Sequence, residues 1–285
     1  MKNTKYTLIL FLIALTTISC GNKKDPQAIQ YLDNIRSLYE KGEYEIALQQ
    51  IDSIQTLFPK AFQEIKDALA LKQDVRRSSD EKQINNCDSL IIAYQPKIDS
   101  IKKLFTYRKE KEDDYGVYIP KTISGNTPNA TTLRSGVNDN GSMYIESVYI
   151  GGQIHNSIKV NTKDGKFAET LPIEGDGFVF RFNHMGKQYE IVQATSVHDN
   201  GLANFIFAYA DSPLTVTLKG KNTTSFALPN IQKKAIADSY QLSRLMLQKD
   251  SLATAKDKAQ MRIKYLNAKR DSIPVVLPNS LQEKK

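Results

Sequence analysis

Two stretches of this 285-residue chain carry apolar residues in alternating steps of three and four, on either side of a segment without a helical period. The first series is Ile84, Cys87, Ile91, Tyr94, Ile98, Ile101, Phe105 and Arg108. The second is Ile231, Ala235, Leu242, Leu245, Leu252, Ala259, Ile263, Leu266 and Ile273, with the polar residues Asp238, Lys249, Lys256 and Arg270 at the remaining positions of the series. This spacing is typical of a coiled-coil seam. We therefore expect two long helices, arm 1 over 77–113 and arm 2 over 229–273, which pair antiparallel as a stalk.

The seams also predict a register. If the arms meet just outside residues 113 and 230, the residue numbers of two facing residues add to about 343. This sum pairs Ile91 with Leu252 and Ile98 with Leu245. A shift of one heptad fits equally well. Pro96 lies within arm 1, so we expect the helix to kink or restart near Gln95.

The N-terminal region 28–76 has a helical period of its own. Its apolar and turn positions are Tyr31, Ile35, Leu38, Gly42, Tyr44, Ala47, Ile51, Ile54 and Pro59. This pattern resembles a single tetratricopeptide repeat, which implies two antiparallel helices with a turn at Lys41–Gly42. One repeat cannot bury both of its faces, so we expect the next helix to cap it.

Residues 114–228 are rich in β-branched and aromatic residues and are divided by four turn-like segments, at 138–141, 163–166, 184–187 and 198–201. Such segments favour hairpins. We expect eight to ten strands in an all-β, sandwich-like domain. The run 202–210 is apolar apart from Asn204 and is expected to be a central strand. The predicted fold is therefore α+β: a helical hairpin and an antiparallel coiled-coil stalk with an inserted β-domain, followed by a tail over 274–285.

The first residues read as an export signal. Residues 1–19 have a basic start, an apolar run too short to span a membrane, and small polar residues before Cys20. The sequence from Leu15 to Cys20 resembles the lipobox of bacterial lipoproteins, although Thr17 stands where leucine is usual. The resemblance implies lipidation of Cys20, with 20–27 as a tether. Gly21 in place of aspartate implies the outer membrane, with the periplasmic or cell-surface face left open. A plain secretory signal is the alternative.

Charge is unevenly distributed. Residues 229–285 carry 12 basic and 5 acidic residues, whereas the remainder of the exported chain is close to neutral. An exported protein rarely meets nucleic acid, so we do not expect it as a partner. The basic side chains of arm 2 either face lipid head groups or form an ordinary solvated helix face.

Few residues are arranged for chemistry. His155, His184 and His198 all lie in the β-domain and are expected to be surface turn residues, because no pattern of three or four metal ligands includes them. No nucleophile elbow or phosphate loop occurs. We therefore predict no catalytic residue, no metal and no cofactor.

Two further residue sets are candidates for recognition or modification. Tyr118, Tyr144 and Tyr149 are candidates for a ligand surface, with core packing as the alternative. Five serines follow aspartate and precede isoleucine or leucine: Ser53, Ser89, Ser100, Ser251 and Ser272. This triplet resembles an O-glycosylation signal of exported proteins in one Gram-negative phylum.

The layout as a whole resembles uncharacterised surface lipoproteins of Gram-negative bacteria, a resemblance that implies no activity. We expect a non-enzymatic envelope lipoprotein whose stalk presents the β-domain to a protein or glycan partner. The alternative is a hydrolase-type enzyme with its site in the β-domain. A concave pocket where a histidine meets carboxylates would favour the enzyme, and a flat aromatic or edge-strand surface would favour the binding module.

Overall fold

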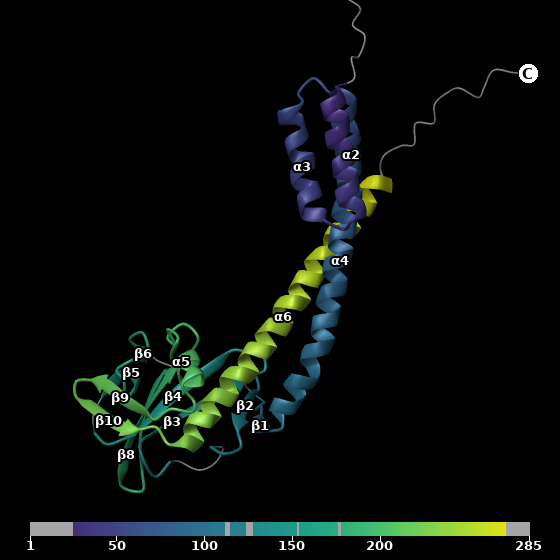
Figure 1. Ribbon diagram of the computed structural model, residues 1–285. Coiled ribbons are helices and arrows are strands. Elements are labelled where there is room, and N and C mark those ends of the chain that lie inside the picture. The colour runs from purple at the N-terminus through teal and green to yellow at the C-terminus, as the bar shows by residue number, and fades with distance from the viewer. Residues whose placement is uncertain (1–24, 112–114, 124–127, 153, 176–177, 272–285) are drawn as a thin grey trace, which may run out of the picture. The chain divides into compact units, whose positions relative to one another are not determined.

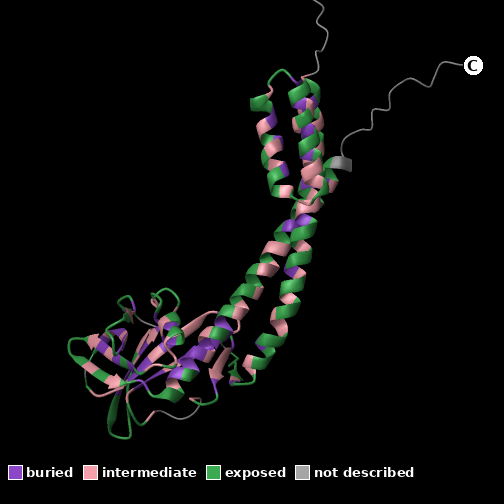
Figure 2. Ribbon diagram, in the orientation of Figure 1, coloured by how far each residue is buried: buried purple, intermediate pink, exposed green. Residues whose placement is uncertain are grey.

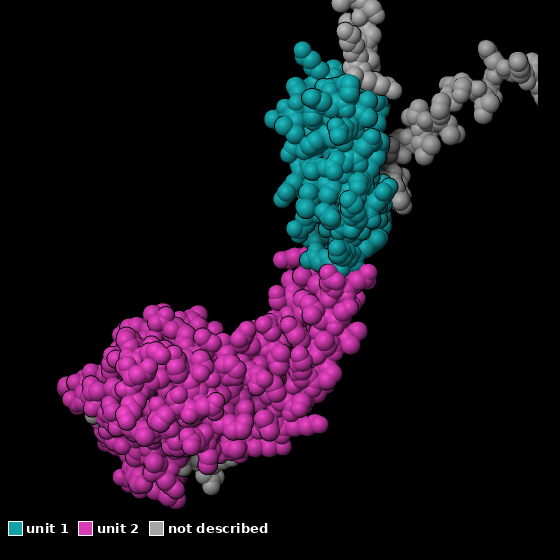
Figure 3. Space-filling model, in the orientation of Figure 1, with its two compact units in different colours: residues 1–83, 259–285 teal, residues 84–258 magenta. Residues whose placement is uncertain are grey.

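The computed structural model describes residues 25–111, 115–123, 128–152, 154–175 and 178–271 (Figure 1). The signal sequence, Cys20, most of the tether, Ser272 and the tail lie outside these residues. The chain divides into two compact units, residues 1–83 with 259–285 and residues 84–258 (Figure 3). Helices combine with antiparallel sheets, which confirms the expected α+β class.

The first unit begins with the predicted helical hairpin, α2 (Pro26–Glu40) and α3 (Tyr44–Leu57). Asp25 caps α2, because its carboxylate accepts hydrogen bonds from the backbone N–H groups of Gln27 and Ala28. Gly42, with φ of 74°, forms the turn in the left-handed region that glycine adopts readily. The hairpin turn at Lys41–Gly42 is therefore where the sequence predicts it.

The hairpin packs on the next helix, α4 (Phe62–Lys102). The buried residues that they share are Leu32, Ile35, Ala47, Ile51, Ile54, Ala68 and Val75. In the same unit, α6 (Asn230–Asp271) contributes Arg262, whose Nη2 lies 2.6 Å from Oδ1 of Asp80 on α4. The predicted boundary between a capping helix and arm 1 at residue 76 is wrong, because α4 runs through it without a break.

The second unit contains two antiparallel sheets. The larger has the strand order β1-β2-β3-β4-β8-β7 and the smaller β10-β9-β5-β6. Their bounds are β1 (Phe105–Arg108), β2 (Val117–Pro120), β3 (Thr132–Asn138), β4 (Met143–Ile150), β5 (His155–Thr162), β6 (Phe167–Glu169), β7 (Val179–His184), β8 (Lys187–Ala194), β9 (Leu214–Gly220) and β10 (Thr223–Ala227).

Three of the four predicted hairpin turns are present. Asn138–Gly141 joins β3 to β4, the segment 163–166 joins β5 to β6, and Met185 and Gly186 join β7 to β8. Met185 and Gly186 have φ values of 48° and 75°, the left-handed conformation that a two-residue hairpin requires.

The fourth segment, 198–201, precedes a helix, so both the hairpin expected there and the central strand expected over 202–210 are wrong. Helix α5 (Leu202–Ala208) buries Leu202, Ala203 and Ile206, a helical spacing. The Asp199 carboxylate accepts hydrogen bonds from the backbone N–H groups of Gly201 and Ala203. These bonds satisfy donors at the start of the helix that a strand would instead direct to a neighbouring strand.

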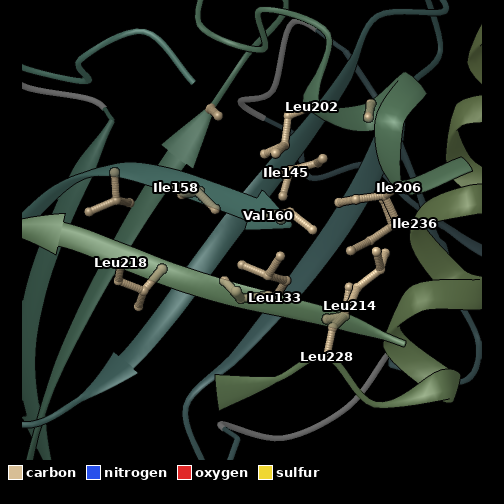
Figure 4. Close-up of a cluster of buried hydrophobic side chains, with 14 of the residues drawn as sticks. Leu133, Ile145, Ile158, Val160, Leu202, Ile206, Leu214, Leu218, Leu228 and Ile236 are labelled. Atoms are coloured by element: carbon tan, nitrogen blue, oxygen red, sulfur yellow. The ribbon is translucent and has the colours of Figure 1, made fainter. Parts of the chain in front are cut away.

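The core of this unit lies between the sheets and against the two helices. Buried residues come from both sheets, from α5 and from α6, and Figure 4 shows their side chains pointing toward one another. They include Leu133, Ile145, Ile158, Val160, Leu202, Ile206, Leu214, Leu218, Leu228 and Ile236. The same core face of β3 also packs on α6, where the Ser135 and Ser239 hydroxyls lie 2.9 Å apart.

Helices α4 and α6 lie antiparallel in this unit. Lys256 Nζ is 2.6 Å from Asp88 Oδ1, and Lys249 donates to Gln95, so paired residue numbers add to 344, close to the predicted 343. Arm 1 is nevertheless shorter than predicted. It ends at Lys102, and Phe105 and Arg108 belong to strand β1. The helix continues through Pro96, so of the kink or restart expected near Gln95 the restart is absent.

Candidate functional site

A buried polar network joins the two sheets. Ser147 Oγ on β4 lies 2.5 Å from His155 Nε2 on β5, and His155 Nδ1 lies 3.0 Å from Glu190 Oε2 on β8. Arg181 on β7 donates to Glu190 Oε1 through Nε at 3.1 Å and Nη2 at 2.8 Å. Serine, histidine and glutamate thus form a chain of hydrogen bonds across the core.

A β-bulge directs His155 into this network. His155 pairs with Gly220 and Ser157 with Lys219, so two steps on β5 match one step on β9. In a regular strand alternate side chains share one face, so Asn156 would point inward with the buried Ile158 and Val160. The extra residue of the bulge shifts this alternation, and His155 points inward instead. The expectation that His155 is a surface turn residue is therefore wrong, because its exposed fraction is 1%.

The network holds Glu190 in its ionised form. Burial raises the pKa of the Glu190 carboxyl, but the hydrogen bonds from His155 and Arg181 outweigh burial and hold the pKa below its ordinary value of 4.5. A fourth hydrogen bond comes from the backbone N–H of His155, which lies 3.1 Å from Glu190 Oε2. The Ser147 hydroxyl, at the other side of the His155 ring, also donates to the Val192 carbonyl at 3.3 Å.

These contacts have the hydrogen-bond order of a Ser-His-acid triad, but the serine is inaccessible. Ser147 has an exposed fraction of 0%, and its side chain faces the interior between the sheets. A substrate carbonyl must come within about 3 Å of a nucleophile. In this arrangement a substrate carbonyl could reach Ser147 only if the two sheets separated. The network therefore links the sheets and holds Arg181 in place at its outer end.

A cavity of about 590 Å³ opens where the network reaches the surface. Val179 and Arg181 of β7 line one side, and the segments 154–156 and 219–221 of the smaller sheet line the other. Its charged lining groups are Glu174, Arg181, Lys219 and Lys221. A volume of this size is within the range of small-molecule sites, about 300 to 1,000 Å³. His155 lines this cavity, whereas Glu190, the carboxylate that it contacts, does not, so the arrangement expected of an enzyme is present only in part.

The β7–β8 hairpin beside this cavity exposes aromatic side chains. Five of the six β7 residues are exposed, and Figure 2 shows the hairpin ending in the exposed class. Phe180 and Met185 have exposed fractions of 47% and 89%, and the Phe182 ring stacks on Tyr189 at 5.1 Å between centroids. In the described part of the sheet β7 is a terminal strand with one neighbour, so the edge-strand criterion for a binding module is met.

The free edge of β7 carries identifiable backbone groups. The carbonyl of Phe178 accepts from the Gln193 N–H at 2.8 Å, which directs this residue toward β8. Backbone groups alternate in direction along an antiparallel strand, so those of Val179, Arg181 and Asn183 face away from β8.

The three predicted tyrosines do not form one surface. Lys102 donates to the Tyr118 hydroxyl at 2.8 Å, and the Tyr118 ring packs with buried residues beside α4 and α6. Tyr144 and Tyr149 project from opposite faces of β4, and Tyr149 packs against the core of both sheets. Desolvation, reinforced by Glu146 and opposed by Arg134, raises the pKa of Tyr144 to about 12. The alternative of packing describes these residues better than a ligand surface does.

The other histidines and Cys87 lie apart from the network. His198 Nδ1 lies 3.1 Å from Thr195 Oγ1, and its ring packs edge-on against Phe178. His184 ends β7, and Cys87 is buried on α4. Within the described residues, no group of three or more potential ligands is placed to hold a metal ion.

The candidate glycosylation serines within the described ranges are all helical. Ser53 lies on α3, Ser89 and Ser100 on α4, and Ser251 on α6. Ser89, Ser100 and Ser251 are exposed, and Ser53 is half-buried.

Among the helices that the structure describes, none combines the length and apolar character needed to cross a bilayer. No protein-family model matches the chain, and no curated protein or solved structure is significantly similar to it.

Proposed function

We propose that this chain is a non-enzymatic lipoprotein of the bacterial outer membrane, anchored by acylated Cys20, whose β-domain binds a partner protein. In this proposal α4 and α6 form a coiled-coil stalk, and the two sheets form a sandwich that the stalk presents. Residues 1–19, which resemble an export signal, support the proposed lipid anchor. The ion pair of Lys256 on α6 with Asp88 on α4 supports the antiparallel pairing of the two helices and hence the proposed stalk.

The observation that carries the binding proposal is the free edge of β7. An edge strand exposes unpaired N–H and C=O groups, and soluble proteins usually protect such edges with charges, proline or a covering segment. On β7 the one charged side chain, Arg181, is engaged by Glu190, and the exposed face carries Phe180 and Phe182. An extended segment of a partner satisfies these backbone groups by joining the sheet as a further strand.

The test is a selection of displayed linear peptides on the full chain in detergent micelles. Asn183→Pro removes an N–H that faces away from β8 and leaves the β7–β8 ladder intact, whereas Asn183→Ala keeps that N–H. Selected peptides should bind the wild type and Asn183→Ala and lose binding to Asn183→Pro, with circular dichroism unchanged in all three. Equal binding to all three would refute strand addition at β7.

The hydrolase alternative is favoured by one observation, the hydrogen-bonded order Ser147, His155 and Glu190. A fluorophosphonate probe labels serines that a neighbouring base activates. We expect no labelling of the wild type, because Ser147 is inaccessible. Labelling that disappears in Ser147→Ala would support the hydrolase and contradict the proposal.

A further inference from the structure

The cationic side chains that line the cavity beside β7 differ in whether an acidic side chain neutralises them. Arg181 is held by Glu190 on one side of its guanidinium, and Lys219 Nζ contacts both oxygens of Glu169 at 2.8 and 2.7 Å. Lys221 is exposed and makes no ion pair with the described acidic side chains. The described lining contains one carboxylate, the exposed Glu174, against three cationic groups.

The fixed ion pairs orient the cations. Glu190 is itself held by His155, so Arg181 cannot turn away without leaving a buried carboxylate short of donors. Donors that are oriented before binding lose little side-chain entropy when a ligand arrives. Lys221 adds a positive charge that a ligand can neutralise.

The lining also argues against a neutral sugar as the ligand. Its apolar members are Ile154, Ile173 and Val179, and none of the described lining residues is phenylalanine, tyrosine or tryptophan. Neutral sugar rings are commonly held on aromatic faces, whereas oxyanions are held by arginine and lysine.

The cavity lies next to the free edge of β7. Val179 and Arg181 belong to β7 and point to the core side of the sheet, because they pair with Val192 and Glu190. Phe180 and Phe182 point to the opposite side. A strand added along β7 places alternate side chains on these two sides. Its core-side residues therefore lie over the cavity, and its other residues lie beside the two phenylalanines.

We propose that the partner segment alternates acidic with apolar residues, and that a carboxylate of this segment enters the cavity and pairs with Lys221 and Arg181. This inference rests on the proposed strand addition at β7. It gives the partner a chemical class: an acidic, extended polypeptide.

The experiment measures fluorescence anisotropy of labelled peptides with the full chain in detergent micelles. One nine-residue peptide alternates valine and glutamate, and its matched partner carries glutamine in place of glutamate. We expect the glutamate peptide to bind at least tenfold more tightly in low salt, and the difference to shrink as salt screens the charges. Lys221→Gln should remove most of that difference and leave the glutamine peptide unaffected. Lys163→Gln, which removes an exposed lysine from the β5–β6 turn, is the matched control.

The outcomes separate this inference from the proposed function. If both peptides bind equally and Asn183→Pro abolishes both, strand addition stands and the acidic class is wrong. If neither peptide binds, both proposals fail. An oligogalacturonate that binds in a Lys221-dependent manner, while the peptides do not, would assign the cavity to an acidic glycan and overturn the peptide inference. If Lys163→Gln weakens the preference for the glutamate peptide as much as Lys221→Gln does, the preference does not arise in the cavity and the inference is wrong.

Discussion

At the scale of single residues, the main feature of this protein is a carboxylate kept ionised inside a β core. Glu190 is nearly fully buried, yet its four hydrogen bonds come from His155 and Arg181 on other strands. Buried polar groups with every partner in place give a core a specific arrangement, and loss of one partner leaves the others uncompensated. The network therefore links three strands of the larger sheet to one of the smaller.

Glu190→Gln tests this interpretation. We expect the free energy of unfolding at pH 7 to fall by about 2 to 3 kcal/mol, because charge-assisted hydrogen bonds are lost. The folded pKa of Glu190 lies below its ordinary value, so its stabilisation is complete above pH 4.5 and is lost as pH falls through the folded pKa. Urea denaturation from pH 7 downward should therefore show the difference between the two proteins shrinking as the pH falls below 4.5. Glu174→Gln, at an exposed carboxylate, is the control, and a difference that does not shrink in acid contradicts the prediction.

Tyr144 provides a second test at this scale. Burial is the largest cause that raises its pKa to about 12 from the ordinary 10.0, so its phenol should titrate near pH 12 in absorbance at 295 nm. Because the folded pKa is raised, this contribution to stability is complete below about pH 10 and lost as pH rises toward 12. Tyr144→Phe should remove that transition, and Tyr115→Phe, at an exposed site, should leave it in place. Retention of the transition in Tyr144→Phe would assign it to another phenol.

At the scale of elements, the pairing of α4 with α6 is the feature that the sequence described best. The seams predicted partner numbers with a sum of about 343, and the contacts of Asp88 with Lys256 and Gln95 with Lys249 have a sum of 344. A repeated three-four step specifies which face of a helix is apolar, and two such faces bury most surface when they are brought together.

A disulfide tests this register. In a chain with Cys20 and Cys87 replaced by serine, Ile91→Cys with Leu252→Cys should oxidise within one molecule, because facing positions bring Cα atoms within about 7 Å. Ile91→Cys with Leu245→Cys, about two helical turns out of register, is the control. Mass spectrometry after mild oxidation distinguishes the two. Efficient bonding of the control, or none in the facing pair, contradicts the register.

Residues of α4 differ in burial, so replacing them by alanine should lower the free energy of unfolding by different amounts. Ile98 is 3% exposed and packs with Leu242, whereas Ile92 on the same helix is 72% exposed. Ile98→Ala should lower the free energy of unfolding by about 2 to 5 kcal/mol, because it removes buried methyl groups and leaves a cavity. Ile92→Ala should change it by about 0.5 kcal/mol or less. Equal effects in thermal or urea unfolding would mean that this face of α4 is not buried in solution.

At the scale of the whole molecule, the proposed function depends on an anchor at Cys20, which lies outside the described residues. The chain has two cysteines, and Cys87 is buried on α4. In a Gram-negative host, labelled palmitate should enter the wild type and Cys87→Ser but not Cys20→Ala. Cys20→Ala should also leave the membrane fraction, since the lipid supplies its membrane affinity. Label retained by Cys20→Ala would exclude lipidation at this cysteine.

The local structure of this protein follows from patterns in its sequence. Gly42 and Gly186 mark turns because their left-handed backbone is a property of a few adjacent residues. The apolar faces of α3, α4 and α6 are likewise visible, because helical spacing repeats over many residues. The strand expected over 202–210 is wrong, since a short apolar run fits either period and the Asp199 hydrogen bonds that begin the helix appear only in three dimensions.

The candidate site depends on contacts between segments that are far apart in the chain. His155 turns inward because a bulge against β9 shifts its alternation, and the partners that make it part of a network are eight and 35 residues away in the chain. Among the strands that the structure describes, β7 ends its sheet with β8 as its neighbour, an order that local residues do not specify. Periodicity and turn chemistry act over a few residues, whereas burial of a polar group and exposure of an edge depend on which distant segments the sheets bring together.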